Sequence, residues 1–176
     1  LYKDMMIDKV LISVSVLLKK NRDLNFVIIG DGPEKDNLVK LASNLGILKQ
    51  CYFLGFKPRS FIRSAAHYSN VVCLPYSGLS LIEAGIMKCA VVAFDYEWNS
   101  ELIVDGYSGY LADSRNIEDI KTKLEKLLLH KKISRSMSEN LFKMTNNLFS
   151  KDSLLRQNNL AYGSLFSDKK NNQKKS

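Results

Sequence analysis

Residues 70–109 decide the fold, and they read NVVCLPYSGLSLIEAGIMKCAVVAFDYEWNSELIVDGYSG. This stretch predicts an apolar strand, a turn of proline, serine and glycine, and a helix that carries one acidic residue. A second apolar strand follows, and then a short acidic segment that ends in glycines. Where a strand ends in a small-residue turn that opens a helix, free backbone N–H groups and the helix dipole point at one spot. The stretch therefore predicts an anion site.

The helix of this stretch is predicted to begin near Ser77, a good N-cap residue, with Gly78 beside it. Glu83 then lies about 7–8 Å further along the axis, because each helical residue adds about 1.5 Å. That is roughly the span from the pyrophosphate of a nucleotide to its ribose hydroxyls. An ionised carboxylate accepts two hydrogen bonds at once, which suits a ribose diol. The alternative for Glu83 is a partly buried acid that pairs with Lys or Arg.

The composition of the whole chain indicates one ordinary globular domain. It has 176 residues, of which 45% are hydrophobic and 25% charged. No stretch approaches the ~18–20 consecutive apolar residues of a membrane span, and no signal peptide is recognisable, so we expect a cytoplasmic protein. Cys51, Cys73 and Cys89 fall in apolar runs without a Cys-x-x-Cys pair, which favours buried thiols in a reducing compartment over a metal or redox site.

Part of the formal net charge of +8 is local to the end of the chain. Residues 167–176 are predicted to be a basic disordered tail. A basic surface of this kind can alternatively hold a protein against anionic lipid at the inner face of a membrane. The lysines concerned are Lys169, Lys170, Lys174 and Lys175.

Strands and helices are predicted to alternate along most of the chain. Such alternation with short loops predicts an α/β fold, in which a parallel sheet is covered by helices on both faces. The predicted strands are 24–29, 51–54, 71–74, 90–94 and 109–112, and the predicted helices are 4–20, 34–45, 58–68, 77–88, 98–104, 116–129, 132–148 and 151–166.

Residues 3–125 resemble the C-terminal, nucleotide-sugar-binding half of a GT-B glycosyltransferase of family 4. Glu83 matches the second acid of that family's Glu-x7-Glu motif, and residues 91–109 resemble the stretch that follows it in one bacterial branch. The resemblance implies a Rossmann-like domain over residues 1–166. It also implies retaining, metal-independent transfer of a sugar from a nucleoside diphosphate donor, in surface polysaccharide or glycolipid assembly.

The resemblance assigns roles to individual residues. Lys3 matches a family lysine that stabilises the charge of the leaving group. The pyrophosphate is expected at the helix start, the ribose on Glu83, and the base near Gly55 and Phe56. The full set of expected donor-binding residues is Gly30, Asp31, Gly32, Gly55, Phe56, Ser77, Gly78, Leu79, Glu83 and Glu101.

The chain departs from the family pattern in three places. Pro75 stands where many members carry the first acid of the motif, and Leu79 stands where the similar bacterial branch tends to carry a basic residue. The strand and the arginine that precede the family's lysine are absent before Lys3. We therefore expect a truncated protein whose missing N-terminal part holds the first sheet strand and the domain that binds a sugar or lipid-linked acceptor. The alternatives are a non-catalytic or partner-dependent subunit that binds nucleotide sugar, and a nucleotide-sugar epimerase.

Other motifs carry less information. Asp95 and Glu97 form an acid-x-acid pair after a strand, which is typical of metal-binding transferases of another fold, but no second ligand group is in view. Trp98 is read as a core or cleft-wall residue. Glu101 either caps the turn that follows it or forms a wall of the sugar pocket. No Gly-x-Gly-x-x-Gly or P-loop motif is present, which weighs against a dinucleotide oxidoreductase or an NTPase, and nothing indicates a nucleic-acid partner.

Overall fold

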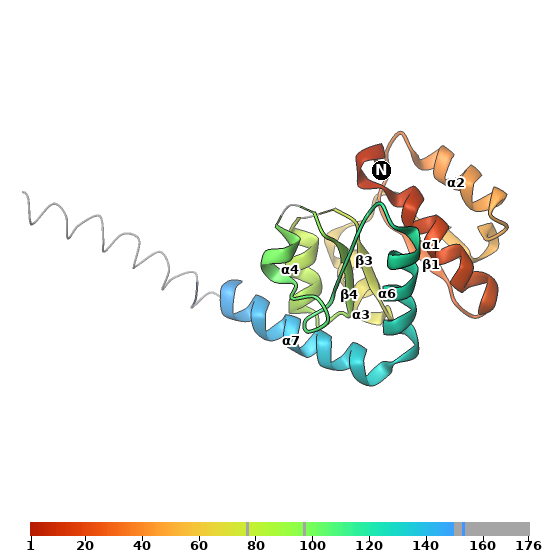
Figure 1. The fold of residues 1–176 in the computed structure, drawn as a ribbon. Helices are drawn as coiled ribbons and strands as arrows, with labels where there is room; N and C mark the ends of the chain where they lie inside the picture. Colours follow the sequence, from red (N-terminus) through yellow and green to blue (C-terminus); the bar gives the residue numbers. More distant parts are fainter. Residues whose placement is uncertain (77, 97, 150–152, 154–176) are drawn as a thin grey trace, which may run out of the picture.

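The computed structural model describes residues 1–76, 78–96, 98–149 and 153. The predicted site residue Ser77, the acid Glu97, the tail 167–176 and, apart from Ser153, the helix predicted over 151–166 lie outside the described residues. The elements are η1 (Lys3–Met5), α1 (Ile7–Lys20), β1 (Phe26–Ile28), α2 (Lys35–Asn44), η2 (Leu48–Gln50), β2 (Cys51–Phe53), α3 (Arg59–Tyr68), β3 (Val72–Leu74), α4 (Leu79–Ile86), β4 (Val91–Phe94), α5 (Asn99–Leu102), β5 (Tyr110–Ala112), α6 (Ile117–Leu129) and α7 (Lys131–Phe149) (Figure 1).

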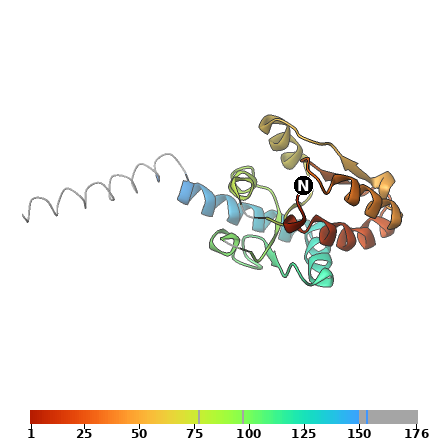
Figure 2. The same ribbon diagram turned by 90° about the horizontal axis from the view of Figure 1, so that it is seen from above.

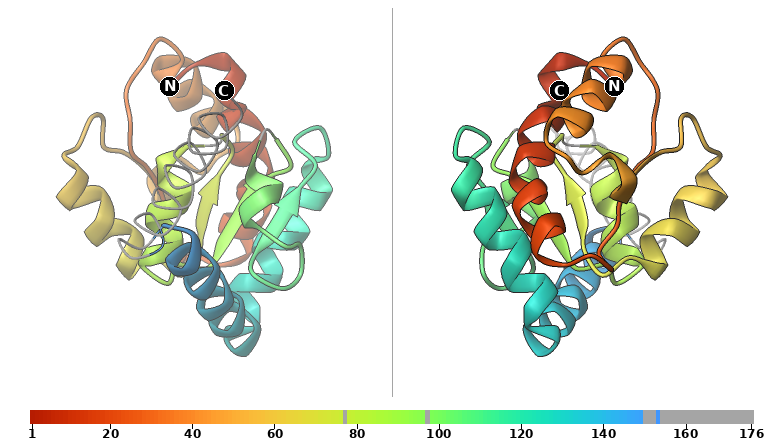
Figure 3. Two further views of the ribbon diagram at one scale, coloured as in Figure 1. Left: turned by 90° about the vertical axis from the view of Figure 1, so that its left-hand side faces the viewer. Right: turned by 90° about the vertical axis from the view of Figure 1, so that its right-hand side faces the viewer.

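The prediction of an α/β fold with parallel strands flanked by helices is confirmed. Strand β1 pairs with β2, while β3, β4 and β5 form a separate sheet in that order. Figure 3 shows helices on both sides of the three-stranded sheet. The described strands form two sheets, because β1 and β3 each have a strand partner on one edge only. The break lies where a doubly wound sheet has its central first strand.

The central strand β4 alternates between two cores. Its four residues are all buried. Val92 and Phe94 pack with residues of α1 and α6, whereas Val91 and Ala93 pack with residues of α4, α5 and α7. This period of two is what a strand covered on both faces requires. The strand therefore fixes the positions of both helical layers.

Helix α1 connects the two sheets. Val10 and Leu17 belong to the core around β4, and Leu11, Val14 and Leu18 belong to the core around β1 and α2. Figure 2 shows α1 lying between α2 and α6. Because α1 is apolar on two sides, it holds the β1–β2 sheet beside the other sheet without strand pairing across the break.

Helix α4 is shorter at both ends than the sequence predicts. It begins after Gly78 and ends at Ile86. At its C-terminus Lys88 adopts a left-handed conformation with φ of 55°. The N–H of Cys89 donates to the carbonyl of Ala84, and the N–H of Lys88 donates to the carbonyl of Gly85. This pair of bonds is a Schellman motif, which stops the helix two residues before the predicted end.

The three cysteines are free thiols in the structure. Cys51 and Cys89 are buried and Cys73 is half-buried. Desolvation raises the pKa of the Cys51 and Cys89 thiols to about 11 and that of Cys73 to about 12. The thiols therefore stay protonated at neutral pH and act as small apolar side chains.

Candidate functional site

The predicted site residues gather where the parallel strands end. Lys3, in η1, precedes α1, which runs back toward the start of β1. Gly30 follows β1, Gly55 follows β2, and Gly78 lies between β3 and α4. Because the strands of each sheet are parallel, each of the three glycines lies at the carboxyl edge of its own sheet, the edge at which open α/β sheets bind ligands.

The loop after β1 and the loop after β2 are joined by hydrogen bonds. The N–H of Gly30 donates to the carbonyl of Gly55 over 2.9 Å. In the same loop, Oδ1 of Asp31 accepts from the Gly32 N–H at 2.9 Å, and Oδ2 accepts from Nζ of Lys35 at 3.2 Å. The structure thus brings Gly30, Asp31, Gly32 and Gly55 together, while their contact with a donor stays a prediction.

Asp31 supplies a test of this loop. The hydrogen bond from the Gly32 N–H, and then the Lys35 ammonium, lower the pKa of Asp31 below its ordinary value of 3.8. A lowered pKa in the folded state adds stability above the ordinary value, and this stability is lost as the pH falls through the lowered value. We expect Asp31→Asn to lower the melting temperature at about pH 7 and to change it much less at about pH 2. An equal loss at both pH values would contradict a role for the charge.

The first residues of the chain lie against the same loop. The backbone nitrogen of Leu1 donates to the carbonyl of Asp31, and the Glu34 N–H donates to the Leu1 carbonyl at 3.2 Å. Lys3, two residues on, is exposed to solvent. Phe56 follows Gly55 and is 84% exposed. Both side chains are therefore free of the core and accessible at the carboxyl edge.

The start of α4 forms the second part of the site. Gly78 is the N-cap residue, and among the described residues no side chain caps the helix. Leu79, the first helical residue, is 63% exposed. The predicted N-cap, Ser77, lies outside the described residues, and the described helix begins at Leu79 instead. The first N–H groups of a helix have no partner within the helix, so those of α4 can bind an anion at this start.

Glu83, on α4, is bound by two arginines that the sequence reasoning did not single out. Its Oε1 lies 3.2 Å from a guanidinium nitrogen of Arg59 and 3.1 Å from one of Arg63. The Glu83 side chain is 22% exposed. Arg59 is the first residue of α3, so the carboxylate lies at the same edge as Gly55. In the sequence, only their spacing of four residues, which places Arg59 and Arg63 on one helix face, indicates that the two arginines can act together. The pairing alternative for Glu83 is thus observed, while its ribose role stays a prediction.

The segment after β4 carries Trp98, Asn99 and Glu101. Trp98 is half-buried and packs against the core on the α4 side of the sheet, in agreement with a core role. Asn99 is fully buried, and its Nδ2 donates to the Phe94 carbonyl at 3.0 Å. Its Oδ1 has no hydrogen-bond partner among the described residues. This amide fixes the turn that leaves β4.

Glu101 is exposed and does not provide the cap considered for the turn that follows it. Ser108 Oγ accepts from the Val104 N–H at 2.9 Å, and Oδ1 of Asp105 accepts from the Leu111 N–H at 2.8 Å. These two side chains satisfy the turn locally. Glu101 is therefore available for the donor contact that the sequence predicts.

Two tyrosines join the turns after β3 and β4. The rings of Tyr76 and Tyr96 lie 5.7 Å apart at an angle of 40°. Aromatic pairs at this separation attract each other. The pair therefore links the loop that opens α4 to the loop that follows Phe94.

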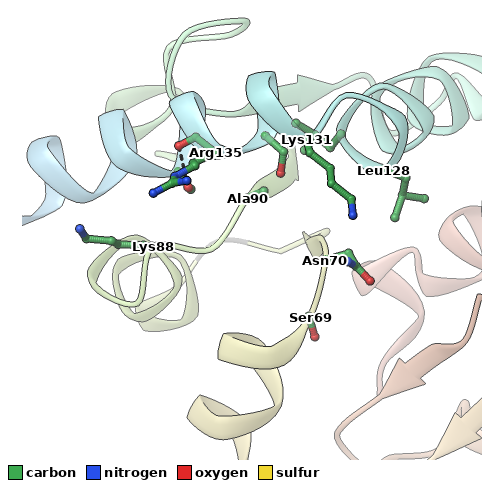
Figure 4. A pocket seen from close by; sticks show the side chains of 10 residues that line it. Ser69, Asn70, Lys88, Ala90, Leu128, Lys131 and Arg135 are labelled. Carbon is green, nitrogen blue, oxygen red and sulfur yellow. Dashed lines mark hydrogen bonds between the residues drawn. The ribbon is translucent and has the colours of Figure 1, made fainter.

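A cavity of about 350 Å³ lies at the opposite edge of the sheet, where β3 and β4 begin (Figure 4). Residues 69 and 70 precede β3, and residues 88 and 90 precede β4. The remaining lining residues come from the end of α6 and the first part of α7. No predicted donor-binding residue lines this cavity. Within the described ranges, no three His, Cys, Asp or Glu side chains form a group able to hold a metal ion.

The described helices include none that is both long and apolar enough to cross a bilayer.

The family model for glycosyl transferases group 1 matches residues 3–144. Alpha-D-kanosaminyltransferase of Streptomyces kanamyceticus is 30% identical over 128 residues, which is 70% of this chain and 33% of that protein. The chain thus spans about a third of the length of this relative.

Solved structures agree with the family match. The C-terminal domain of the group 1 family protein LpcC from Francisella tularensis has a TM-score of 0.75 at 27% identity, and the match covers 84% of this chain and 80% of that one. A mutant of Staphylococcus aureus TarM, solved with fondaparinux, alpha-GlcNAc-glycerol and UDP, has a TM-score of 0.75 at 26% identity and covers 85% of this chain and 31% of that one. These matches confirm the predicted likeness to a GT-B C-terminal domain. The chain belongs to the group 1 glycosyl transferases.

Proposed function

We propose that this chain is the donor-binding half of a retaining, metal-independent glycosyltransferase of family 4. The observation that carries the proposal is the gathering of Gly30, Gly55, Gly78 and Glu83 at the carboxyl edge of the strands. The loops after β1 and β2 share a hydrogen bond there, and α3, which follows β2, binds the carboxylate of α4. One edge then supplies contacts for the base, the ribose and the diphosphate of a nucleotide sugar.

The proposed chemistry needs positioning and charge stabilisation more than covalent help from the protein. The bond between the anomeric carbon and the phosphate oxygen breaks, and the electron pair stays with the leaving nucleoside diphosphate. A hydroxyl of the acceptor forms the new bond on the same face and loses its proton to solvent or to the leaving phosphate. Hydrogen-bond donors and positive charges of the protein that are already oriented around the growing negative charge lower the barrier. The start of α4 supplies a dipole, and Lys3 supplies a positive charge.

The acceptor side of the reaction is proposed to belong to a domain outside these residues. Two observations support this: the chain covers 33% of the length of the kanosaminyltransferase, and the strands form two sheets with a break between β1 and β3. We assign the missing central strand to the same additional segment. The work of the enzyme is proposed to be cytoplasmic, at the inner face of the membrane, in surface polysaccharide or glycolipid assembly. A relative solved with UDP and alpha-GlcNAc-glycerol is in keeping with such substrates.

A second candidate is a subunit that binds nucleotide sugar without transferring it. Two residues at the start of α4 favour it, because Pro75 replaces an acid that touches the transferred sugar in many members and Leu79 presents an exposed apolar side chain instead of a basic one. Sugar contacts in this loop are therefore fewer than in the similar branch.

Titration of the full-length protein with UDP- and GDP-linked sugars, followed by product analysis, tests both candidates. We expect micromolar to millimolar donor binding and transfer of the sugar to an acceptor hydroxyl with its anomeric configuration kept. Binding without turnover supports the second candidate. Free isomerised sugar identifies an epimerase, and the absence of binding to either donor class contradicts the proposal.

A further inference from the structure

Arg59 and Arg63 form an array around Glu83 that the predicted donor site does not include. Both guanidinium groups approach the same carboxylate oxygen, Oε1, at 3.2 and 3.1 Å. The two arginine side chains are 63% and 55% exposed, whereas Glu83 is 22% exposed. The carboxylate is therefore the sheltered member of the array.

The array leaves part of the carboxylate open to a ligand. A carboxylate has about four acceptor positions on its two oxygens. The two guanidinium contacts occupy positions on Oε1, and within the described residues no hydrogen bond or ion pair uses Oε2 of Glu83. Two acceptor positions match the two hydroxyls of a ribose. The same contacts restrict the rotamers of Glu83, so less conformational freedom is lost when a ligand binds.

We infer that Arg59 and Arg63 are positioning residues for the ribose of the donor, acting through Glu83. This inference rests on the proposed function, because it gives Glu83 its ribose role. Arg59 opens α3 directly after the loop that carries Gly55 and Phe56, where the base is proposed to bind. Helix α3 then connects the proposed base position to the proposed ribose position through the two ion pairs with Glu83.

Ribose discrimination separates this role from simple attraction of an anion. UDP and GDP are each compared with their 2′-deoxy forms, since the deoxy forms lack one hydroxyl that Glu83 binds. We expect the chain to bind the ribose form about tenfold more tightly than the 2′-deoxy form, because the deoxy form loses one hydrogen bond to a charged group. In Arg59→Ala/Arg63→Ala, we expect this ratio to fall to about two, with circular dichroism showing that the fold is kept. Lysine at both positions is expected to restore part of the ratio.

Lys57→Ala is the matched control. Lys57 is a cation on the loop that carries Gly55 and Phe56, and its Nζ lies 5.6 Å from the centre of the Phe61 ring. It makes no ion pair with Glu83. Its loss is expected to weaken both forms by the same factor and to leave the ratio unchanged. A ratio that stays near ten in the double arginine variant but falls in Glu83→Gln overturns the positioning role and leaves the proposed function intact. Tighter binding of UDP or GDP by the arginine variants also overturns the positioning role, because the arginines then compete with the ribose for the Glu83 carboxylate. No binding of UDP or GDP, or a ratio unaffected by Glu83→Gln, removes the ribose role itself.

Discussion

Gly85→Val is expected to lower the free energy of unfolding by about 3 kcal/mol, because α4 and α7 touch at this position without room for a side chain. A Cβ placed on Gly85 comes within 2.4 Å of Cγ2 and 2.8 Å of Oγ1 of Thr145. Thr145 is fully buried, and its hydroxyl donates to the Leu141 carbonyl at 2.9 Å, so it cannot turn away cheaply. Urea denaturation followed by circular dichroism measures the loss.

A rescue by the partner residue identifies the clash as the cause. Gly85→Ala is expected to cost about 1–2 kcal/mol, since the gain in helix propensity offsets part of the contact. Adding Thr145→Ala to Gly85→Ala removes the two closest atoms and is expected to recover part of this cost. If the two changes are additive instead, the contact between the helices does not decide the loss.

Glu83→Gln is expected to weaken nucleoside diphosphate binding by about 1–3 kcal/mol, which is about 5- to 150-fold in the dissociation constant. The amide keeps the size of the side chain but replaces one acceptor oxygen by a donor, so it cannot accept both ribose hydroxyls while it faces Arg59 and Arg63. Isothermal titration of wild type and variant with UDP and GDP measures the change. An unchanged affinity in a folded variant removes Glu83 from the site.

Glu139→Gln is a suitable control for this experiment. Glu139 also forms an ion pair, with Lys88 at 3.0 Å, but it lies on α7 beside the amino edge of the sheet. The substitution makes the same change in net charge at the opposite edge. We expect no measurable change in nucleotide affinity, and a loss comparable to that of Glu83→Gln would point to a general charge effect.

The sequence was sufficient where neighbouring residues determine the structure. The apolar run of β4 and its alternation between two cores follow from residues 91–94 alone. The N-cap of α6 is local in the same way, since Oδ1 of Asn116 accepts from the Asp119 N–H three residues on at 3.1 Å. Periodicity and capping are local properties, so such elements can be read within a residue or two of their observed ends.

The sequence was insufficient where distant segments meet. Glu83 and Arg63 are 20 residues apart, and only the packing of α3 beside α4 brings their side chains together. The close contact of Gly85 with Thr145 has the same origin. Charge pairs and helix contacts across the fold therefore required coordinates, while the positions of the candidate residues at the strand ends did not.

The break between β1 and β3 has a practical consequence for handling the protein. Each of these strands has one edge without a strand partner in the described chain, and Val27 of β1 is 46% exposed. Unpaired N–H and C=O groups on a strand edge can pair with another molecule. Concentrated solutions of these residues are therefore expected to self-associate through intermolecular β-structure, and a peptide that adds a strand between β1 and β3 is expected to keep the protein monomeric.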